Sequence, residues 1–408
     1  MKETIKKIIP YFLISWYHFL LAFFGALLYL FPSFNKRIKV IGITGTNGKS
    51  TVVQMTSEIL EKAGYKVCSI SSIKFKIGEK EWPNTLKMTM PGRFKIQSFL
   101  RKAVNKGCQY AVLEITSQGI AQYRHKFIGF DIALITNLTP EHIESHKGFD
   151  NYMKAKGKLF KAVKGIHIIN IDDQNAKYFL QFPAKKKYGY TIEGKEHEEM
   201  EVISCKKEFN LNLLGEFNIS NALGATCIGL SQGISLGNCK QALESIKDVS
   251  GRMEIIIKEP FKVIVDYAHT PDALEKVYRS IKEEGKMICV LGSCGGGRDK
   301  WKRPELGKIA GKYCDQIILT NEDPYDENEE GILNQIEKGV GKEAIKILDR
   351  REAIKKAIQS AEHGDTVIIT GKGSEPWMCV ANGKKIPWGD RKIAKEEVET
   401  RMNIFKLK

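Results

Sequence analysis

The sequence lacks the paired cysteines that hold small secreted domains together. Its nine cysteines are scattered, odd in number and contain no Cys-x-x-Cys pair, which argues against a disulfide framework or a zinc site and predicts reduced thiols. It also lacks internal repeats and low-complexity stretches. Hydrophobic residues make up 42% of the 408 residues, which excludes a disordered chain. The length predicts two or three domains, each with its own core.

Acidic residues are in deficit. The chain has 64 Lys and Arg against 48 Asp and Glu, a formal net charge of +16. This excess predicts anionic partners such as nucleotides or a lipid surface. No nucleic-acid-binding motif accompanies the charge, so no nucleic-acid partner is expected.

Charge is absent from one long segment. Residues 8–35 contain no Asp, Glu, Lys or Arg, and about 20 apolar residues suffice to cross a bilayer. The segment is too long for the core of a signal peptide, and no small-residue cleavage site follows it. We expect residues 1–37 to associate with the membrane and to tether a cytoplasmic enzyme to its inner face. The alternative is a hydrophobic helix packed on the rest of the protein.

A strand pattern at residues 39–44 leads into a glycine-rich turn and then into an amphipathic helix. The turn reads Gly45-Thr46-Asn47-Gly48-Lys49-Ser50-Thr51. Glycines let backbone N–H groups approach phosphates, and the N-terminus of the helix adds positive potential. We expect Lys49 to reach the β- and γ-phosphates of ATP and Ser50 to bind Mg²⁺. The spacing is longer than the usual G-x4-G-K, because five residues separate Gly42 from Gly48.

Strand and helix patterns alternate along the rest of the chain. Apolar runs recur at 110–115, 131–136, 166–171, 262–268, 287–292, 316–320 and 365–370. This order predicts an α/β protein. We expect a P-loop-type central ATPase domain with a mostly parallel sheet at 38–249. A C-terminal Rossmann-like α/β domain should follow at 250–408, and the N-terminal segment should form a hydrophobic helix.

Taken in order, these motifs resemble the Mur ligases. The resemblance spans residues 38–395 and rests on the glycine turn, Thr136-Asn137-Leu138, the stretch 152–160, Gly251-Arg252-Met253-Glu254 and the block 266–275. With Gly295-Gly296-Gly297-Arg298-Asp299 and Gly371-Lys372-Gly373-Ser374-Glu375, the chain looks most like the MurE branch. Members of that branch are UDP-N-acetylmuramoyl-dipeptide ligases, which add the third residue of the peptide.

The resemblance implies an ADP-forming ligase of peptidoglycan precursor synthesis, with ATP and Mg²⁺ as cofactors. In this family ATP phosphorylates the acceptor carboxylate, and the amine of the amino acid then attacks the acyl phosphate. Two anions meet in the first step, so metal ions and cations must neutralise their charge. The matching positions imply that Glu114 joins Ser50 on the first metal and that His142 binds a second metal. Lys156 matches a lysine that the family carbamylates, although the residues alone would favour a surface lysine.

The remaining site residues are also implied by matching positions. Those near ATP are Asn221, Arg252 and Asp266, with Asn218 beside them. Those near the muramoyl peptide are Thr89, Ser117, Gln122 and Arg124. Those near the incoming amino acid are Arg298, Glu322, Asp323, Gly371 and Glu375.

Two departures from the family bear on substrates. MurE enzymes have an N-terminal UDP-binding domain, and here the apolar segment stands in its place, which leaves open whether a separate partner binds the UDP end. Enzymes selective for meso-diaminopimelate carry Asp-Asn-Pro-Arg, whereas this chain has Glu322-Asp323-Pro324-Tyr325. The loss of Arg and the two acids favour lysine as the amino acid added. Two other functions stay open: a membrane-attached poly-γ-glutamate or folylpolyglutamate-type ligase, and a non-catalytic Mur-like scaffold.

Overall fold

The chain forms two compact units. The computed structural model describes residues 10–34, 37–86, 88–204, 209–281 and 285–406. The first unit comprises Met1–Pro140, Gly148–Leu211 and Phe217–Ile246, and the second comprises Glu141–Lys147, Asn212–Glu216 and Lys247–Lys408. Three short segments that were expected in the first domain, 141–147, 212–216 and 247–249, therefore belong with the second unit.

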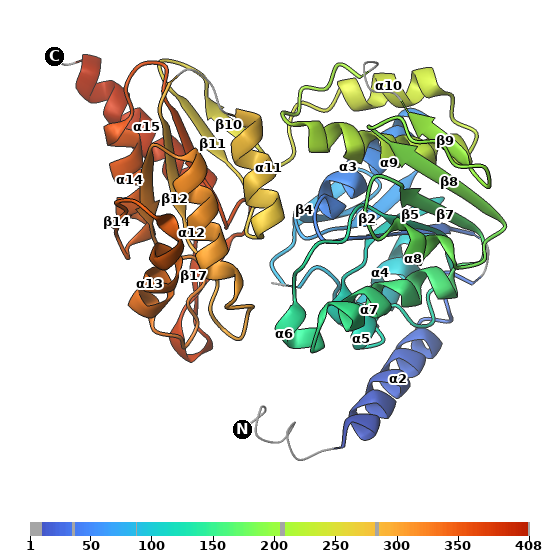
Figure 1. The fold of residues 1–408 in the computed structure, drawn as a ribbon. Coiled ribbons are helices and arrows are strands. Elements are labelled where there is room, and N and C mark those ends of the chain that lie inside the picture. The colour runs from blue at the N-terminus through green and yellow to red at the C-terminus, as the bar shows by residue number, and fades with distance from the viewer. Residues whose placement is uncertain (1–9, 35–36, 87, 205–208, 282–284, 407–408) are drawn as a thin grey trace. The chain divides into compact units, whose positions relative to one another are not determined.

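A nine-stranded sheet forms the centre of the first unit (Figure 1). In chain order its strands are β1 (Lys39–Thr44), β2 (Val67–Ile70), β3 (Lys74–Ile77), β4 (Lys80–Pro83), β5 (Tyr110–Glu114), β6 (Phe130–Ile135), β7 (Ile166–Asn170), β8 (Lys186–Thr191) and β9 (Glu201–Ser204). Their order across the sheet is β4-β3-β2-β5-β1-β6-β7-β8-β9, and all neighbours are parallel except β2–β3 and β3–β4. The expected mostly parallel sheet is thus confirmed, with an antiparallel edge that the sequence patterns did not indicate.

Helices cover both faces of this sheet, which explains why its central strands are apolar throughout. The helices are α3 (Lys49–Lys62), α4 (Arg93–Asn105), α5 (Ser117–Ala121), α7 (Phe149–Ala162), α8 (Ala176–Leu180), α9 (Glu216–Ser231) and α10 (Leu236–Glu244). In Figure 1, α3, α9 and α10 lie on one side of the sheet, and α4, α5, α7 and α8 lie on the other. Strand β1 lies between β5 and β6, so the glycine turn leaves the sheet at its centre.

The second unit has a six-stranded sheet of order β10-β11-β15-β12-β13-β14. These strands are β10 (Glu254–Ile257), β11 (Lys262–Val265), β12 (Met287–Leu291), β13 (Gln316–Leu319), β14 (Ile345–Lys346) and β15 (Thr366–Ile369). Only β10 is antiparallel to its neighbour. A hairpin of β16 (Trp377–Cys379) and β17 (Lys385–Pro387) encloses a 3-10 turn, Ala381–Gly383. The helices are α6 (Ile143–His146), α11 (Pro271–Ile281), α12 (Lys302–Tyr313), α13 (Glu329–Val340), α14 (Arg350–Ser360) and α15 (Asp390–Lys406).

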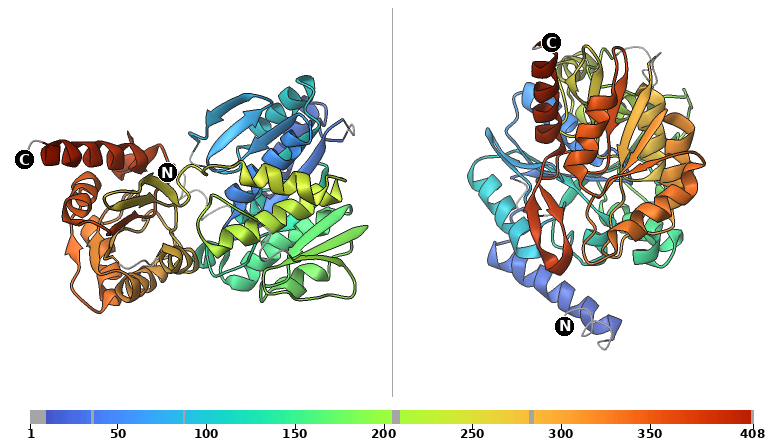
Figure 2. Two further views of the ribbon diagram at one scale, coloured as in Figure 1. Left: turned by 90° about the horizontal axis from the view of Figure 1, so that it is seen from above. Right: turned by 90° about the vertical axis from the view of Figure 1, so that its left-hand side faces the viewer.

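The apolar N-terminal segment forms helix α2 (Tyr11–Leu28), which packs against α4 (Figures 1 and 2). Its small residues Ala22 and Ala26 are buried, and Ser15 Oγ donates a hydrogen bond of 2.8 Å to the Tyr123 hydroxyl. The opposite side of the helix is exposed and apolar, with Trp16 and Leu28 each 64% exposed. The helix is therefore packed on the first unit on one side only.

Membrane association was the favoured expectation for this segment, and the structure gives it no support. None of the helices in the described part of the chain is both long enough and apolar enough to span a bilayer. Residues 8, 9 and 35 of the uncharged segment lie outside the described residues.

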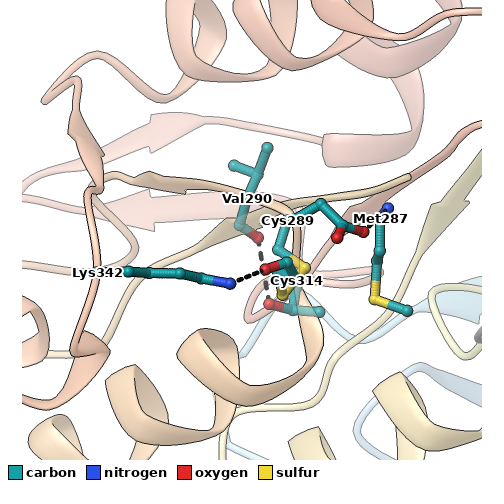
Figure 3. Close-up of a disulfide and its surroundings, with 7 residues drawn as sticks. Met287, Cys289, Val290, Cys314 and Lys342 are labelled. Carbon is teal, nitrogen blue, oxygen red and sulfur yellow. Dashed lines mark hydrogen bonds between the residues drawn. A yellow bond between two sulfur atoms is a disulfide. The ribbon is translucent and has the colours of Figure 1, made fainter.

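Two of the thiols that were expected to be reduced are joined in the second unit. Cys289 in β12 and Cys314 after α12 form a disulfide, with their Cα atoms 5.9 Å apart (Figure 3). The strand and the end of the following helix bring these residues together across 25 positions of sequence. Spacing along the chain could not show this proximity, so the expectation was wrong for this pair. The other described cysteines are free.

Candidate active site

The glycine turn after β1 has the backbone that phosphate binding requires. Gly45 and Gly48 have φ values of 144° and 82°, a region that favours glycine. A side chain on Gly48 would also clash, because its Cβ would lie 2.3 Å from Asn221 Oδ1. The Asn47 amide donates to Asn137 Oδ1 at 2.9 Å, which fixes the turn against the end of β6. The turn therefore directs its remaining amides and the start of α3 to one place, as an anion site needs.

Lys49 begins α3 and bends back over the turn. Its Nζ donates to the Thr46 carbonyl at 2.7 Å and lies 4.0 Å from Glu114 Oε1. Glu114 ends β5, is 3% exposed, and belongs to the neighbouring strand in the sheet. The sequence-predicted lysine and carboxylate are thus brought together by the parallel pairing of β1 with β5.

Ser50 and Glu114 offer oxygen ligands of the kind that Mg²⁺ prefers. Ser50 Oγ donates to Glu114 Oε2 at 2.7 Å. Sequence reasoning missed Ser72, whose amide donates to the same carboxylate oxygen at 2.9 Å and whose hydroxyl lies 2.7 Å from that of Ser50. No group of three or more His, Cys, Asp or Glu residues that could hold a metal occurs among the described residues. The hydroxyl and the carboxylate therefore fit a Mg²⁺ that receives its other ligands from phosphate and water.

Lys156 is buried in the same cluster. Its Nζ donates to the Gly45 carbonyl at 2.6 Å and lies 4.7 Å from the ring centre of Tyr152. The neighbouring Lys154 and Lys158 are exposed, so the surface-lysine interpretation holds for them and fails for Lys156, which is 2% exposed. Burial, and then repulsion from Lys49, holds the pKa of Lys156 well below its ordinary value. The lowered pKa favours the neutral amine, which is the form that reacts with CO₂.

The predicted ATP residues fall in both units. Asn218 and Asn221 lie buried on α9, and Asn221 Nδ2 donates to Asn218 Oδ1 at 3.2 Å. In the second unit, Asp266 accepts hydrogen bonds from the amides of Met253 and Ala268 at 2.7 and 2.6 Å. Burial raises the pKa of Asp266, against the opposing effect of nearby Arg252. These amides hold the carboxylate in a fixed orientation.

The predicted acceptor residues cluster around α5 and the loop before α4. Arg124 donates to Gln122 Oε1 at 2.7 Å and to the Met90 carbonyl, beside Thr89. Ser117 is the first residue of α5 and is buried. Sequence reasoning missed Arg93, whose guanidinium donates to the Gln122 carbonyl at 2.5 Å. An arginine four positions after Thr89, in the stretch Pro91-Gly92-Arg93, was the feature of the sequence that could have indicated this contact.

The predicted amino-acid residues lie at the carboxyl ends of β12, β13 and β15 in the second unit. Lys372 is fully buried, and its Nζ donates to Asp323 at 2.8 Å and to Glu375 at 2.6 Å. Glu322 is 4% exposed, and its Oε2 has no hydrogen-bond partner among the described residues. A side chain on Gly371 would place a Cβ 2.5 Å from that oxygen, so glycine keeps this space open.

The acids of this second cluster differ in their charge balance. Burial, and then the neighbouring Asp323, raises the pKa of Glu322, against the opposing effects of Lys372, Arg350 and Lys302. Asp323 is balanced by Lys372, whereas Glu322 Oε2 has no such partner among the described residues. An incoming ammonium group would donate a hydrogen bond to this oxygen. Arg298, another predicted contact, follows Gly296 and Gly297, which both have positive φ.

His142 is placed in the second unit, at the start of the one-turn helix α6, with φ of 56°. Its neighbour Glu141 forms a buried ion pair with Lys302 at 3.0 Å, and the amide of Ile143 donates to Asp299 at 3.0 Å. These contacts fix the segment that carries His142 within the second unit. The assignment of His142 to a second metal stays a prediction.

Comparison with known proteins gives a consistent result. Residues 43–229 match the model of the Mur ligase middle domain, and residues 251–373 match that of the Mur ligase glutamate ligase domain. The UDP-N-acetylmuramoyl-L-alanyl-D-glutamate--2,6-diaminopimelate ligase of Caldanaerobacter subterraneus subsp. tengcongensis is 37% identical over 380 residues, 88% of this chain and 78% of that relative.

Solved structures agree. A structure of a UDP-N-acetylmuramoyl-L-alanyl-D-glutamate--2,6-diaminopimelate ligase aligns with a TM-score of 0.58 at 27% identity, covering 90% of this chain and 79% of that one. The folylpolyglutamate synthase of Mycobacterium tuberculosis, solved with ADP and AMPPCP, aligns with a TM-score of 0.67 at 14% identity, covering 85% and 91%. At that identity the second likeness concerns the fold alone.

Proposed function

Because this chain belongs to the Mur ligase family, we propose that it is an ADP-forming ligase that joins an amino acid to a UDP-N-acetylmuramoyl-dipeptide in peptidoglycan precursor synthesis. The observation that carries this proposal is the cluster of Lys49, Ser50, Glu114 and Lys156 around one glycine turn. A scaffold without catalysis would not need these four side chains. We assign residues 38–249 to the ATP-binding domain and residues 250–408 to the amino-acid domain.

The reaction has two steps, and the residues of the turn serve the first. An oxygen of the acceptor carboxylate attacks the γ-phosphorus of ATP, and ADP leaves. Lys49 and the amides of the turn neutralise the phosphates, while Ser50 and Glu114 would hold Mg²⁺, which offsets the charge of the two anions. The amine of the amino acid then attacks the acyl carbon, phosphate leaves, and the amine nitrogen loses a proton. Because both steps need the reacting groups aligned, the rigidity of the buried cluster favours them.

Lys156 serves this reaction as a carbamate. Its neutral amine attacks CO₂, a C–N bond forms, one proton is released, and the neutral side chain becomes an anion beside Lys49. The burial of Lys156 and its distance of 2.6 Å to the Gly45 carbonyl support this assignment, because a permanently charged amine would be costly there. The new carboxylate would orient a metal or the acyl phosphate.

The amino acid is lysine in our proposal, although the relatives matched are named for 2,6-diaminopimelate. Glu322 is buried with one oxygen unpartnered among the described residues, and so it suits a terminal ammonium. Tyr325 stands where enzymes for diaminopimelate carry an arginine that binds the second carboxylate. The backbone of Tyr325 has φ of 52°, and its ring lies close to Gly296.

The decisive experiment is an ADP-release assay with UDP-MurNAc-L-Ala-D-Glu and a panel of amino acids, with products identified by mass spectrometry. Acceptor-dependent ADP release and a tripeptide product are expected with lysine. Release with dihydropteroate and glutamate alone would instead favour the folylpolyglutamate alternative. ADP release that does not depend on any acceptor would overturn the ligase proposal.

A contact with lipid is a separate proposal, carried by the exposed side of α2. Leu13, Trp16, Tyr17 and Leu20 form an apolar strip on it, each at least 41% exposed. The packed partner α4 carries exposed lysines, which complement anionic lipid headgroups. The full chain is expected to pellet with vesicles containing anionic lipid, and Trp16→Glu is expected to weaken this. Equal recovery of both proteins in the supernatant would sink the idea.

A further inference from the structure

An open groove with lysines along its rim lies in the first unit, beside the segment between β4 and α4 that carries Thr89. It has a volume of about 1020 Å³ and is formed by the β3–β4 hairpin and α4. Its floor consists of Phe75, Ile77, Trp82, Phe94 and Phe99, and we call it the lysine-rimmed groove. This size is enough for a nucleotide-sized ligand.

The two faces of the hairpin differ in charge. Phe75 pairs with Trp82 across the strands, and Ile77 pairs with Lys80, so these four side chains share the groove face. The opposite face carries Lys76, which pairs with Glu61 at 2.8 Å and Glu81 at 3.2 Å. The charge of Lys76, on the face away from the groove, is therefore neutralised, whereas the charge of Lys80, on the groove face, is not neutralised by any described residue.

Four lysines line the groove, namely Lys80, Lys95, Lys102 and Lys106. None of them forms an ion pair with any residue in the described ranges, and no described Asp or Glu lines the groove. Lys95 lies in the first turn of α4, and Lys102 and Lys106 lie at its end. Their spacings of seven and four residues place them on one face of the helix. A concentration of unpaired ammonium groups over an apolar floor favours an anion that carries two or more charges.

Aromatic side chains form the floor of the groove beneath these lysines. The ring centres of Phe75 and Trp82 lie 5.9 Å apart, and those of Trp82 and Phe99 lie 6.3 Å apart. Phe94 is 38% exposed at the edge. Phe75 and Phe99 are themselves buried, so Trp82 and Phe94 are the rings that leave a face on which a nucleobase stacks.

The groove lies next to the segment that carries Thr89, one of the predicted acceptor contacts. Thr85, Leu86 and Pro91 line it and flank Thr89 in the sequence. The side chain of Asn84 holds this loop by donating to the carbonyls of Ser71 and Met88 at 2.9 and 3.1 Å. A molecule that reaches Thr89 with its peptide end can therefore lie with its other end in the groove.

We propose that the lysine-rimmed groove binds the nucleoside diphosphate end of the acceptor, with the diphosphate on the lysines and the base on the aromatic floor. The inference rests on the proposed function for the identity of the acceptor. It places recognition of the UDP group within this chain, so that no separate UDP-binding partner is needed.

The test compares two acceptors in the full chain: UDP-MurNAc-L-Ala-D-Glu and MurNAc-L-Ala-D-Glu without the nucleotide. For Lys95→Ala/Lys102→Ala, the KM of the nucleotide-linked acceptor should rise about tenfold, because two charge-assisted contacts are lost. The kcat for either acceptor should not change, and neither should the KM of the nucleotide-free acceptor. Lys161→Ala, an exposed lysine on α7 outside the groove, is the matched control. An unchanged KM in the double variant, with ligase activity present, would overturn the groove and leave the function standing.

Calorimetry with UDP, UMP and farnesyl diphosphate tests the groove without any turnover. UDP should bind the wild type more tightly than UMP, and Phe94→Ala and the double-lysine variant should weaken it. The calorimetry shows whether the groove binds UDP even if the protein ligates no acceptor. In that case the proposed function fails and the groove proposal stands or falls separately. Binding of farnesyl diphosphate in preference to UDP, with the same dependence on Lys95 and Lys102, would overturn the nucleoside assignment in favour of a lipid diphosphate.

Discussion

Two lysines of like charge, Lys49 and Lys156, lie in one cluster with a single carboxylate, Glu114, and the two cations repel each other. Lys49 contacts Glu114 and the carbonyl of the turn, while burial, and then Lys49, lowers the pKa of Lys156. Adding CO₂ to Lys156 would turn the repulsion between them into attraction. A single modification therefore relieves the electrostatic cost of the cluster and supplies a reactive-site carboxylate.

Lys156→Ala is expected to be inactive and to regain part of its activity with short carboxylic acids that occupy the place of the carbamate. The measurement is acceptor-dependent ADP release with and without formate or acetate. Lys158→Ala, on the same helix but exposed, should keep its full rate. A full-rate Lys156→Ala enzyme would leave the lysine a purely structural role.

Lys49→Ala and Glu114→Gln are each expected to lower kcat at least about 100-fold, because each removes charge stabilisation in the phosphoryl-transfer step. Circular dichroism should show that both variants keep their fold. Raising the Mg²⁺ concentration should partly restore Glu114→Gln and not Lys49→Ala. Turnover near the wild-type value in either variant would remove the ATP and Mg²⁺ site from this turn.

His125 should make the protein sensitive to acid. Burial, and then the charges of Lys126 and Lys158, lowers its pKa from 6.5 to about 3. Below pH 6.5 the unfolded chain binds a proton that the folded protein does not bind, so stability falls as the pH falls toward 3. One such group contributes at most about 1.4 kcal/mol per pH unit. Urea unfolding from pH 7 to pH 4 should show a shallower loss for His125→Phe, and parallel curves for the two proteins would contradict this.

At the scale of elements, α2 acts as a brace for the loop after α5, which carries the predicted acceptor contacts Gln122 and Arg124. The ring of Phe19 lies 6.1 Å from that of Tyr123, which stands between Gln122 and Arg124 in the chain. It lies 5.2 Å from the ring of Phe127, which follows them. The loop residues Tyr123 and Phe127 both have positive φ, a conformation that packing must maintain. The helix therefore holds a backbone that would not persist alone.

Phe19→Ala is expected to lower the free energy of unfolding by about 2 kcal/mol, less than for a fully buried ring because Phe19 is half-buried. The KM for the acceptor should rise, and the KM for ATP should not. Leu20→Ala, on the exposed side of the same helix, is the control and should change neither. Equal effects on both KM values would indicate general unfolding and not a local brace.

The loop after β13 is expected to set the choice of amino acid. Tyr325→Arg should raise the use of meso-diaminopimelate relative to lysine, because an arginine fork can bind the second carboxylate with two hydrogen bonds. The ratio of kcat/KM for the two amino acids is the measurement, and Tyr325→Phe is the control for loss of the hydroxyl. A wild-type preference for meso-diaminopimelate would show that our interpretation of residues 322–325 is wrong.

At the scale of the whole molecule, sequence patterns predicted the strands and helices that have a local hydrophobic pattern. They missed the features that depend on contacts between residues far apart in the sequence. The apolar runs at 110–115 and 287–292 appear as β5 and β12, because strands buried on both faces leave a continuous signal. The antiparallel edge β3–β4 was missed because its strands have four residues each and mix charge with aromatics.

The residues of the candidate site divide in the same way, into those that a local motif predicts and those that only tertiary contacts reveal. The glycine turn was evident from its residues, whereas the burial of Lys156 among exposed lysines could be reached only through the family resemblance. Ser72, Arg93 and Lys372 depend on tertiary contacts that no local spacing records. The pairing of Cys289 with Cys314 is of the same kind.

The position of α2 has a thermodynamic corollary. One side of this helix touches the loop that carries Gln122 and Arg124, and its other side is open. Any molecule that covers the open side and shifts the helix changes the affinity for the acceptor by some factor. Reciprocity then requires the acceptor to change the affinity for that molecule by the same factor. A saturating acceptor would thus strengthen or weaken whatever binds α2, so the occupancy of this face would report the supply of substrate.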